Sequence, residues 1–189
     1  NGKALAVKAD ASKEADILRL FKAADDVGTL SVLINNAGVV DLPQRVDEMS
    51  EARIVRMMTI NAIGPILCAR EAVKRMSTAR GGKGGVIVNV SSAAALIGGP
   101  GEYVDYAASK GAIDTFTLGL AKEVATEGIR VAAVRPGLIE TEIHASGGQP
   151  DRAQQSASLI PMQRPGTAEE VAAAIVWLIN ATPSYANGV

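Results

Sequence analysis

Short apolar runs alternate with longer amphipathic stretches along this chain, and the alternation constrains its fold more than any other feature. The apolar runs predict buried strands at 4–8, 31–35, 86–90 and 129–134. The amphipathic stretches predict helices over about 12–26, 50–76, 102–127 and 167–178. Strands that alternate with helices pair in parallel and are covered by helices on both faces. The sequence therefore predicts an α/β fold built on a doubly wound parallel sheet.

Capping residues and helix breakers mark the ends of the predicted helices. Ser12 is expected to cap the first helix, and Thr167 with Glu170 forms a capping-box pattern for the last. Gly128 is expected to end the long helix 102–127. Because proline has no N–H, we expect the helix 50–76 to be disturbed around Gly64-Pro65.

Polar or glycine-containing motifs directly follow the predicted strands. These motifs are Asp10, Asn36 to Gly38, Ser91-Ser92 and Pro136-Gly137. In open α/β sheets, ligands bind beyond the carboxyl ends of the strands. The sequence therefore predicts one binding site at that edge.

Tyr106 and Lys110 are four residues apart on a predicted helix, so they lie one turn apart on the same face. A tyrosine ionises near pH ~10, and a fixed cation lowers its pKa toward that of a general acid/base at neutral pH. Tyr103 is a competing phenol, but position 107 is alanine, so Tyr103 has no lysine one turn on. The alternative is a half-buried helix tyrosine beside a solvated lysine.

Together the motifs closely resemble the short-chain dehydrogenase/reductase family, over nearly all 189 residues. They occur in the family's order: Val7 to Asp10, Asn35 to Gly38, Asn61 within 59–64, Val88 to Ser92, Tyr106 with Lys110, and Arg135 to Thr141. The resemblance implies one Rossmann-type domain over 1–189 and an NAD(P)-dependent oxidoreductase, using NAD or NADP. The implied reaction interconverts a secondary alcohol and a ketone by hydride transfer.

The resemblance assigns catalysis to Tyr106, Lys110, Ser92 and Asn61. Tyr106 would be the acid/base, and Ser92 would hold and polarise the substrate oxygen. Ser91 is the rival serine, and both serines together also suit a polar exit from a strand. Lys110 would lower the pKa of Tyr106 and bind the nicotinamide ribose hydroxyls.

The main-chain carbonyl of Asn61 would hold a water that links the lysine to solvent. The local sequence supports this role, because Pro65 has no N–H to donate to the carbonyl of Asn61. A helix kink without catalytic purpose is the alternative.

The resemblance also implies a cofactor-binding set and a lid. The set consists of Asp10, Ala11, Asn36, Ala37, Gly38, Tyr106, Lys110, Pro136, Gly137, Ile139 and Thr141. Asp10 resembles an acidic residue that accepts from the adenine amino group, although alone it is equally well a surface aspartate. Residues 142–163 match the family's substrate lid. His144 lies in this segment and is expected to be exposed, with contact to the substrate as the alternative.

Composition excludes several other classes of function. The net charge of −1 gives no electrostatic reason to bind nucleic acid or an anionic membrane. No apolar run approaches the ~20 residues of a membrane span, and no signal peptide is recognised, so we expect a cytoplasmic protein. One cysteine, Cys68, and one histidine make an internal disulfide impossible and a transition-metal site unexpected.

Two further expectations concern packing and assembly. Trp177 lies in an apolar helix stripe and is expected in the core or in an interface. The helices around 103–127 and 61–76 match those that pair across subunits in tetramers of the family, which implies a homotetramer.

The glycine-rich turn that cradles a dinucleotide pyrophosphate, Gly-x-x-x-Gly-x-Gly in this family, does not occur in these 189 residues. By resemblance, the family's first two strands are missing and its last strand is cut short. In the strand order 3-2-1-4-5-6, the missing strands lie between 4–8 and 31–35. We therefore expect the natural protein to be longer. A catalytically inactive dinucleotide-binding relative, or an inactive truncated product, is the alternative.

Overall fold

The computed structural model describes residues 3–180 and 185–189, and its centre is a three-stranded parallel sheet. The strands are β1 (Val32–Asn35), β2 (Gly85–Val90) and β3 (Ile129–Val134), in the order β1-β2-β3. Consecutive strands are parallel and in register, with Val32 opposite Val86 and Val86 opposite Arg130. The predicted α/β fold with a parallel sheet is confirmed.

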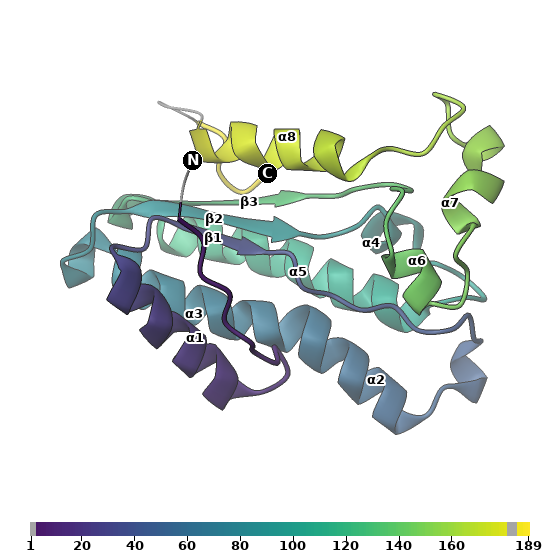
Figure 1. The fold of residues 1–189 in the computed structure, drawn as a ribbon, viewed down its shortest axis with the longest axis horizontal. Helices are drawn as coiled ribbons and strands as arrows, with labels where there is room; N and C mark the ends of the chain where they lie inside the picture. The colour runs from purple at the N-terminus through teal and green to yellow at the C-terminus, as the bar shows by residue number, and fades with distance from the viewer. Residues whose placement is uncertain (1–2, 181–184) are drawn as a thin grey trace.

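Helices lie on both sides of this sheet (Figure 1). On one side lie α1 (Glu14–Val27), α2 (Glu51–Met58), the π-helical turn η2 (Thr59–Ile63), α3 (Gly64–Met76) and α5 (Val104–Glu123). On the other side lies α8 (Ala168–Asn180). Short helices near the carboxyl ends of the strands are α4 (Ala94–Ile97), α6 (Ile143–Ser146) and α7 (Arg152–Gln155). Single 3₁₀ turns are η1 (Val46–Glu48), η3 (Thr78–Arg80), η4 (Ala125–Glu127) and η5 (Ala157–Leu159).

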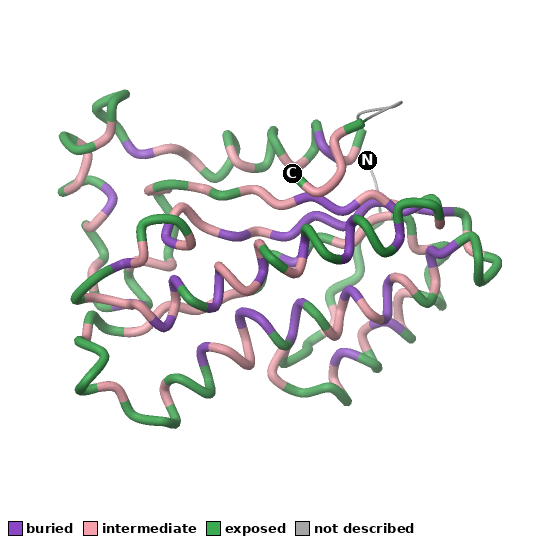
Figure 2. Tube along the Cα trace, turned by 180° about the vertical axis from the view of Figure 1, so that it is seen from behind, coloured by how far each residue is buried: buried purple, intermediate pink, exposed green. Residues whose placement is uncertain are grey.

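The alternation of side chains along the strands divides the core into two layers. Ile87, Val131 and Ile129 face α3 and α5, where they pack with residues such as Met76 and Leu120. The intervening residues Val86, Val88 and Ala132 face α8 and pack against Leu178. The buried parts of the tube in Figure 2 follow the strands and the inner faces of these helices. Both faces of β2 are therefore buried, as its mainly apolar sequence predicts.

A buried amide network joins the sheet to its helices. Asn35 Nδ2 donates to Asn89 Oδ1 (2.9 Å) and to the carbonyl of Pro65 (3.2 Å). Asn89 Nδ2 in turn donates to Thr117 Oγ1 (2.8 Å), which donates to the carbonyl of Ile113. Because these polar groups are partnered, their burial carries no large penalty. The network fixes the end of β1 against α3 and α5.

The helix disturbance expected near Gly64-Pro65 takes the form of the π turn η2. The N–H of Gly64 donates to the carbonyl of Thr59, five residues back. A π turn inside an α-helix is rare and is found frequently at functional sites. Asn61 lies in it and is fully buried.

The continuous helix from Glu51 to Met76 is long and apolar enough to cross a membrane, by length and composition only. The expectation that no segment reaches this limit is therefore wrong. Helices in the core of soluble proteins pass the same test. This helix carries Ala69, Ala72 and Met76 in the main core.

Several expected element ends differ in the structure. Residues 4–8 form no strand, because a strand needs a hydrogen-bonding neighbour and this segment has none among the described residues. Ser12 does not cap α1: its hydroxyl donates to Asp10 Oδ1, and Lys13 takes the N-cap position without a side-chain bond. The long helix α5 begins at Val104 and ends at Glu123, before the η4 turn.

Two other expected ends agree with the structure in part or in full. Gly128 adopts the left-handed conformation of a helix cap, with φ of 73°, but it ends the η4 turn rather than α5. The capping box of α8 is formed, since Glu170 N donates to Thr167 Oγ1 and Thr167 N donates to Glu170 Oε2. The sequence predicts Trp177 in the core or in an interface. It is 62% exposed, so it does not lie in the core.

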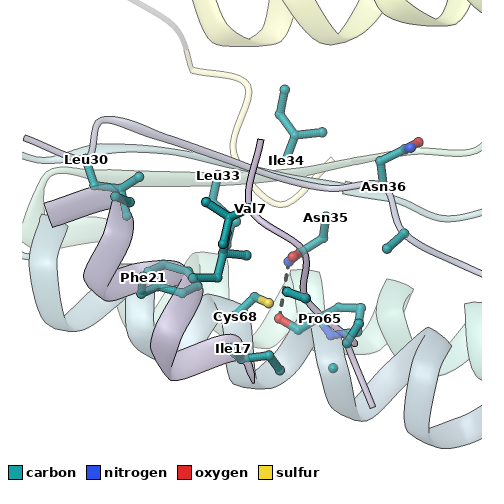
Figure 3. Close-up of a pocket in the computed structure, with 16 residues that line it drawn as sticks. Val7, Ile17, Phe21, Leu30, Leu33, Ile34, Asn35, Asn36, Pro65 and Cys68 are labelled. Carbon is teal, nitrogen blue, oxygen red and sulfur yellow. Dashed lines mark hydrogen bonds between the residues drawn. The ribbon is translucent and has the colours of Figure 1, made fainter. Parts of the chain in front are cut away.

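An apolar cavity of about 340 Å³ lies between residues 7–11, α1 and the free edge of β1 (Figure 3). Val7, Phe21, Leu30 and Leu33 gather around it, whereas Ile34 points to the opposite side of β1. The cavity occupies the place where the strand order 3-2-1-4-5-6 puts two strands between 4–8 and 31–35. This explains why residues 4–8 lack a strand partner.

The opposite edge of the sheet is partly covered by the last residues of the chain. Gly188 N donates to the carbonyl of Val131 (2.8 Å), and Ala133 N donates to the carbonyl of Val189 (2.6 Å). The side chain of Asn187 joins Val131 N to the carbonyl of Ala121. These contacts begin a further pairing beside β3.

Candidate functional site

The four predicted catalytic residues come together beyond the carboxyl end of β2. Ser92 follows that strand directly, Tyr106 and Lys110 lie in the first turns of α5, and Asn61 lies in η2. Their common location follows from topology, because α5 and η2 pack against each other beside the central strand. The rule that parallel sheets bind ligands at this edge is consistent with the arrangement.

Tyr106 is half-buried, and its pKa is raised by that burial, while a hydrogen bond with Ser92 acts in the opposite direction. Lys110 Nζ lies 5.8 Å from the centre of the Tyr106 ring. The expected lowering of the Tyr106 pKa is therefore not what the structure shows. Tyr106 is a neutral phenol at neutral pH, which is the form that can donate a proton to a carbonyl oxygen.

Lys110 is buried with 4% of its surface exposed, and its ammonium donates to the carbonyl of Val90 at 2.8 Å. Burial lowers its pKa to about 8, against a smaller opposing effect of Asp114. Burying a cation costs free energy unless the charge is paired and hydrogen-bonded. The one described hydrogen bond leaves two of its three N–H donors available to a ligand.

The two candidate serines differ clearly in their contacts. Ser91 is buried, and its hydroxyl donates to the carbonyl of Lys110 at 3.2 Å. Ser92 is half-buried, accepts from Ala94 N at 3.1 Å and shares a hydrogen bond with Tyr106. The geometry therefore favours Ser92 as the group that faces a substrate, and gives Ser91 a structural contact with α5.

The side chain of Asn61 makes a two-sided contact with Val39, just after the Asn36-Ala37-Gly38 turn. Asn61 Oδ1 accepts from Val39 N, and its Nδ2 donates to Val39 O, both at 2.8 Å. Nδ2 also lies 3.2 Å from Ser109 Oγ on α5. Asn61 thus connects η2, α5 and the loop that follows β1, in addition to the carbonyl role expected from its sequence.

Gly38 faces both Asn61 and Lys110. A Cβ atom at Gly38 would lie 3.4 Å from Asn61 Oδ1 and 3.4 Å from Lys110 Nζ, so the backbone of Gly38 runs directly beside the ammonium. The two spare ammonium donors of Lys110 fit the hydroxyls of a ribose. The residues present therefore fit the nicotinamide ribose end of NAD(P).

The predicted adenosine-side residues lie farther from Tyr106, toward the cavity at β1. Ala11, Asn36 and Ala37 line that cavity, whereas Tyr106 and Lys110 do not. Asp10 is exposed, and hydrogen bonds from Ser12 lower the pKa of its carboxyl. Ala11 is also in close contact with the helix, as a Cβ at Gly64 would come within 2.6 Å of its carbonyl oxygen.

The segment 135–141 closes the site on the β3 side. The carbonyl of Pro136 accepts from Ala93 N, which ties it to the loop that follows Ser92. Ile139 pairs with Gly166, and its carbonyl oxygen lies 3.0 Å from His144 Nε2. His144 is half-buried, so the expectation of a freely exposed histidine is wrong. Gly137 and Thr141 are exposed.

The predicted lid, residues 142–163, contacts the start of the catalytic helix through Arg152. Its guanidinium donates to Glu102 Oε2 at 2.7 Å and to the hydroxyl of Tyr103, and it stacks 4.8 Å from the Tyr103 ring centre. Burial and Glu102 raise the pKa of Tyr103 to about 12. The hydroxyl and ring of Tyr103 therefore contact Arg152 of the lid. Tyr106 is the phenol that lies next to Ser92 and Lys110.

Sequence reasoning missed two sets of contacts around Tyr106. One is the Arg152 contact just described, and the other is an ion pair between Arg53 and Asp105. The partners are 50 and 52 residues apart, and no local pattern signals such pairing. Among the described residues, no cluster of three His, Cys, Asp or Glu side chains is arranged for a metal ion.

Comparison with known proteins places these features in a family. The family model described as enoyl-(acyl carrier protein) reductase matches residues 1–189. The uncharacterized oxidoreductase YgfF of Escherichia coli is 55% identical over 99% of this chain and 76% of its own length. Glucose 1-dehydrogenase 2 of Bacillus subtilis is 38% identical over 99% of this chain and 72% of its own.

Solved structures show the same fold with a nicotinamide cofactor. A 3-ketoacyl-(acyl-carrier-protein) reductase from Brucella melitensis, complexed with NADH, has a TM-score of 0.88 and 32% identity, and the match covers 98% of this chain and 74% of the other. ElxO with NADP bound has a TM-score of 0.82 and 32% identity, over 95% of this chain and 72% of that one.

Proposed function

The chain belongs to the short-chain dehydrogenase/reductase family, and from that premise we propose that it is an NAD(P)-dependent oxidoreductase that interconverts a secondary alcohol and a ketone. The observation that carries the proposal is the contact between Tyr106 and Ser92 one turn from the buried Lys110. A protein that only binds a dinucleotide has no need for a phenol paired with a hydroxyl. We propose Tyr106, Ser92, Lys110 and Asn61 as the working set.

In the reducing direction, the Tyr106 hydroxyl donates its proton to the carbonyl oxygen of the substrate. Ser92 donates a hydrogen bond to the same oxygen, where negative charge develops. The bound NAD(P)H supplies the hydride that completes the alcohol. Oxidation reverses these steps, with Tyr106 accepting the alcohol proton.

Lys110 and Asn61 support the proton transfer. Below its pKa of about 8 the Lys110 ammonium is charged, and its positive field favours the phenolate left after Tyr106 gives up its proton. The π turn at Asn61 suits a carbonyl that holds a water, because Pro65 cannot donate back to it. That water would return a proton from solvent to the site.

The remaining residues of the cofactor site are proposed on resemblance and position. Lys110 next to Gly38 would hold the nicotinamide ribose, and Pro136, Gly137, Ile139 and Thr141 would border the nicotinamide ring. Asp10, Ala11, Asn36 and Ala37 would border the adenosine. We propose a small alcohol or ketone as substrate, a cytoplasmic location and a homotetramer.

The test is a turnover assay with NADH, NADPH and their oxidised forms against a panel of sugars, 3-oxoacyl thioesters and hydroxysteroids. Nicotinamide absorbance reports hydride transfer directly. Turnover of at least one alcohol–ketone pair is the expected result. Tight cofactor binding without turnover of any member would favour the inactive dinucleotide-binding relative instead.

A further inference from the structure

A nearly buried ion pair lies at the start of the catalytic helix α5, where it has no part in the chemistry proposed above. Arg53 of α2 donates through Nε to Asp105 Oδ2 at 2.8 Å, and its Nη2 lies 3.4 Å from Asp105 Oδ1. The Arg53 side chain is 9% exposed and that of Asp105 is 3% exposed. Two charges removed from water in this way need good partners, because desolvation costs several kcal/mol per ion.

Asp105 is also bonded to the backbone of the acid/base residue. Its Oδ1 accepts from the N–H of Tyr106 at 2.9 Å. This N–H lies in the first turn of α5, where helix donors have no partner within the helix. The carboxylate of Asp105 therefore fixes the backbone from which the phenol of Tyr106 extends.

Arg53 joins this point to the loop that follows the Asn36-Ala37-Gly38 turn. Its Nη1 donates to the carbonyl of Leu42 at 2.7 Å and to Gln44 Oε1 at 3.0 Å. A backbone bond from Gln44 N to Glu102 O, 2.7 Å long, adds a second link to the start of α5. One guanidinium thus holds a loop and the catalytic helix together, a task suited to its planar fork of donors.

The same loop touches the lid. A Cβ on Gly147 would come within 2.8 Å of Val40 Cγ1, and a Cβ on Gly148 would overlap the side chain of Leu42. The backbone of the lid therefore approaches this loop closely at two successive glycines. A displacement of the loop would move the lid as well as Tyr106.

We propose that Arg53 and Asp105 are positioning residues that set Tyr106 relative to the loop 39–44 and the lid, so that turnover depends on a pair that touches neither substrate nor cofactor. The proposal rests on the proposed function. A displacement of about 1 Å at a reacting group can reduce the rate about a hundredfold. The pair is therefore expected to affect kcat far more than cofactor affinity.

Three variants separate positioning from simple stability. Asp105→Ala removes the acceptor for Tyr106 N–H, and Arg53→Met removes the guanidinium while keeping much of its apolar stem. Asp105→Asn keeps an oxygen that can accept from Tyr106 N–H. We expect kcat to fall about tenfold to a hundredfold in the first two. It should fall less in Asp105→Asn, which keeps the bond from Tyr106 N–H but turns an amide nitrogen, a second donor, toward Arg53 Nε.

The double variant and a distant ion pair provide the controls. Arg53→Met with Asp105→Ala should cost little more than either single change, because both disturb one unit. Arg75→Met breaks a similar ion pair with Glu71, whose side chain is 5% exposed. This pair lies in the C-terminal half of α3. Arg75→Met should lower thermal stability while leaving kcat within about twofold.

The outcomes are read as kcat, KM and cofactor Kd, each measured on protein shown to be folded by circular dichroism. Unchanged kcat in folded Arg53→Met and Asp105→Ala, with lower melting temperatures only, would overturn the proposal. Loss of kcat in Asp105→Asn equal to that in Asp105→Ala would overturn it too, because the acceptor would then not be the cause.

Hydrogen exchange keeps this test separate from the proposed function. If the unaltered protein turns over no substrate, the proposed function fails, and the pair is judged by the exchange rate of the Tyr106 amide. Asp105→Ala should accelerate that exchange about tenfold or more, whereas Asp105→Asn and Arg75→Met should not. Equal exchange in all variants would overturn the positioning role by itself.

Discussion

Two titratable side chains, the half-buried Tyr106 and the buried Lys110, lie one turn apart at the start of α5, and burial shifts both of them toward their neutral forms. Tyr106 has a raised pKa, and Lys110 has a pKa lowered to about 8. For the phenol, the hydrogen bond with Ser92 counteracts this effect. At the scale of residues, burial of these two titratable groups therefore costs free energy that apolar core residues would not cost.

Stability measurements should reveal the cost of burying Lys110. Its pKa is 10.5 when unperturbed and about 8 in the fold, so the folded state loses its proton first as the pH rises. The free energy of unfolding should therefore rise between pH 8 and pH 10.5, by about 3 kcal/mol for this group. Lys110→Met should lack that rise.

Urea unfolding of both proteins from pH 7 to pH 10.5 measures the difference directly, since other titrating groups largely cancel. Turnover of Lys110→Met should be lost over the whole range. A difference in stability that does not change with pH would show that Lys110 has an ordinary pKa in the fold.

The two serines after β2 should respond differently to removal of the hydroxyl. Ser92→Ala removes the partner of Tyr106 and is expected to lower kcat about a hundredfold or more. Ser91→Ala loses only a bond to the carbonyl of Lys110, so kcat should fall much less while stability falls by about 1 kcal/mol. Steady-state kinetics and thermal unfolding of the pair decide the matter, and a larger kcat loss in Ser91→Ala would reverse our assignment.

At the scale of elements, the helix from α2 through η2 to α3 connects the two ends of the proposed cofactor site. In its π turn, Asn61 forms hydrogen bonds with Val39 and Ser109. Three residues further along the same helix, Gly64 lies against Ala11. The close approach at Gly64 has no room for a side chain, because a Cβ there would come within 2.6 Å of a backbone oxygen. A single helix thus fixes parts of both the catalytic and the adenosine-side residues.

Adding a methyl group at Gly64 should therefore weaken cofactor binding. Gly64→Ala would push the backbone of Ala11 out of place and is expected to raise the Kd for NADH or NADPH about tenfold. Gly111→Ala is the matched control, since nothing lies within 4 Å of a Cβ at that helix position. The control should leave Kd unchanged and stabilise the protein by about 0.5–1 kcal/mol. Equal Kd values for both variants, measured by fluorescence titration, would contradict the role given to Gly64.

The sequence predicted elements well where local signals decide them, and less well where partners do. The predicted strand 86–90 differs from β2 by one residue, and 129–134 matches β3, since apolar runs flanked by glycines are local signals. Residues 4–8 have a similar apolar character but no strand neighbour, so they form no ladder. Lys13 rather than Ser12 is the N-cap residue of α1, because Asp10 accepts the hydrogen bond of the serine hydroxyl.

At the scale of the whole molecule, the sheet has one covered centre and two unequal edges. β2 is buried on both faces, and the last residues of the chain cover part of β3. β1 borders an apolar cavity and exposes Ile34 to 44%. The family resemblance indicated from the sequence that strands belong there. The long-range contacts of Arg53 with Asp105 and of Arg152 with Glu102 could be seen only in the folded chain.

Assembly offers a test at the same scale. Ile63 and Ile66 on the long helix and Leu118 on α5 are exposed to 48%, 37% and 46%, on helices that the resemblance assigns to subunit contacts. We expect light scattering to give four times the subunit mass, and Ile66→Asp to lower it. Val46→Asp, at an exposed site in the η1 turn, should leave the mass unchanged. A monomer at all concentrations would refute the tetramer.

The central claim, that Tyr106 is the acid/base of a working oxidoreductase, is tested most directly by Tyr106→Phe. The change removes one hydroxyl and keeps the ring that packs at 5.9 Å from Tyr103. We predict that kcat falls at least about 10²-fold to 10⁴-fold while the Kd for the nicotinamide cofactor stays within about twofold. Turnover that survives in Tyr106→Phe, on a substrate that the unaltered protein accepts, would contradict the account.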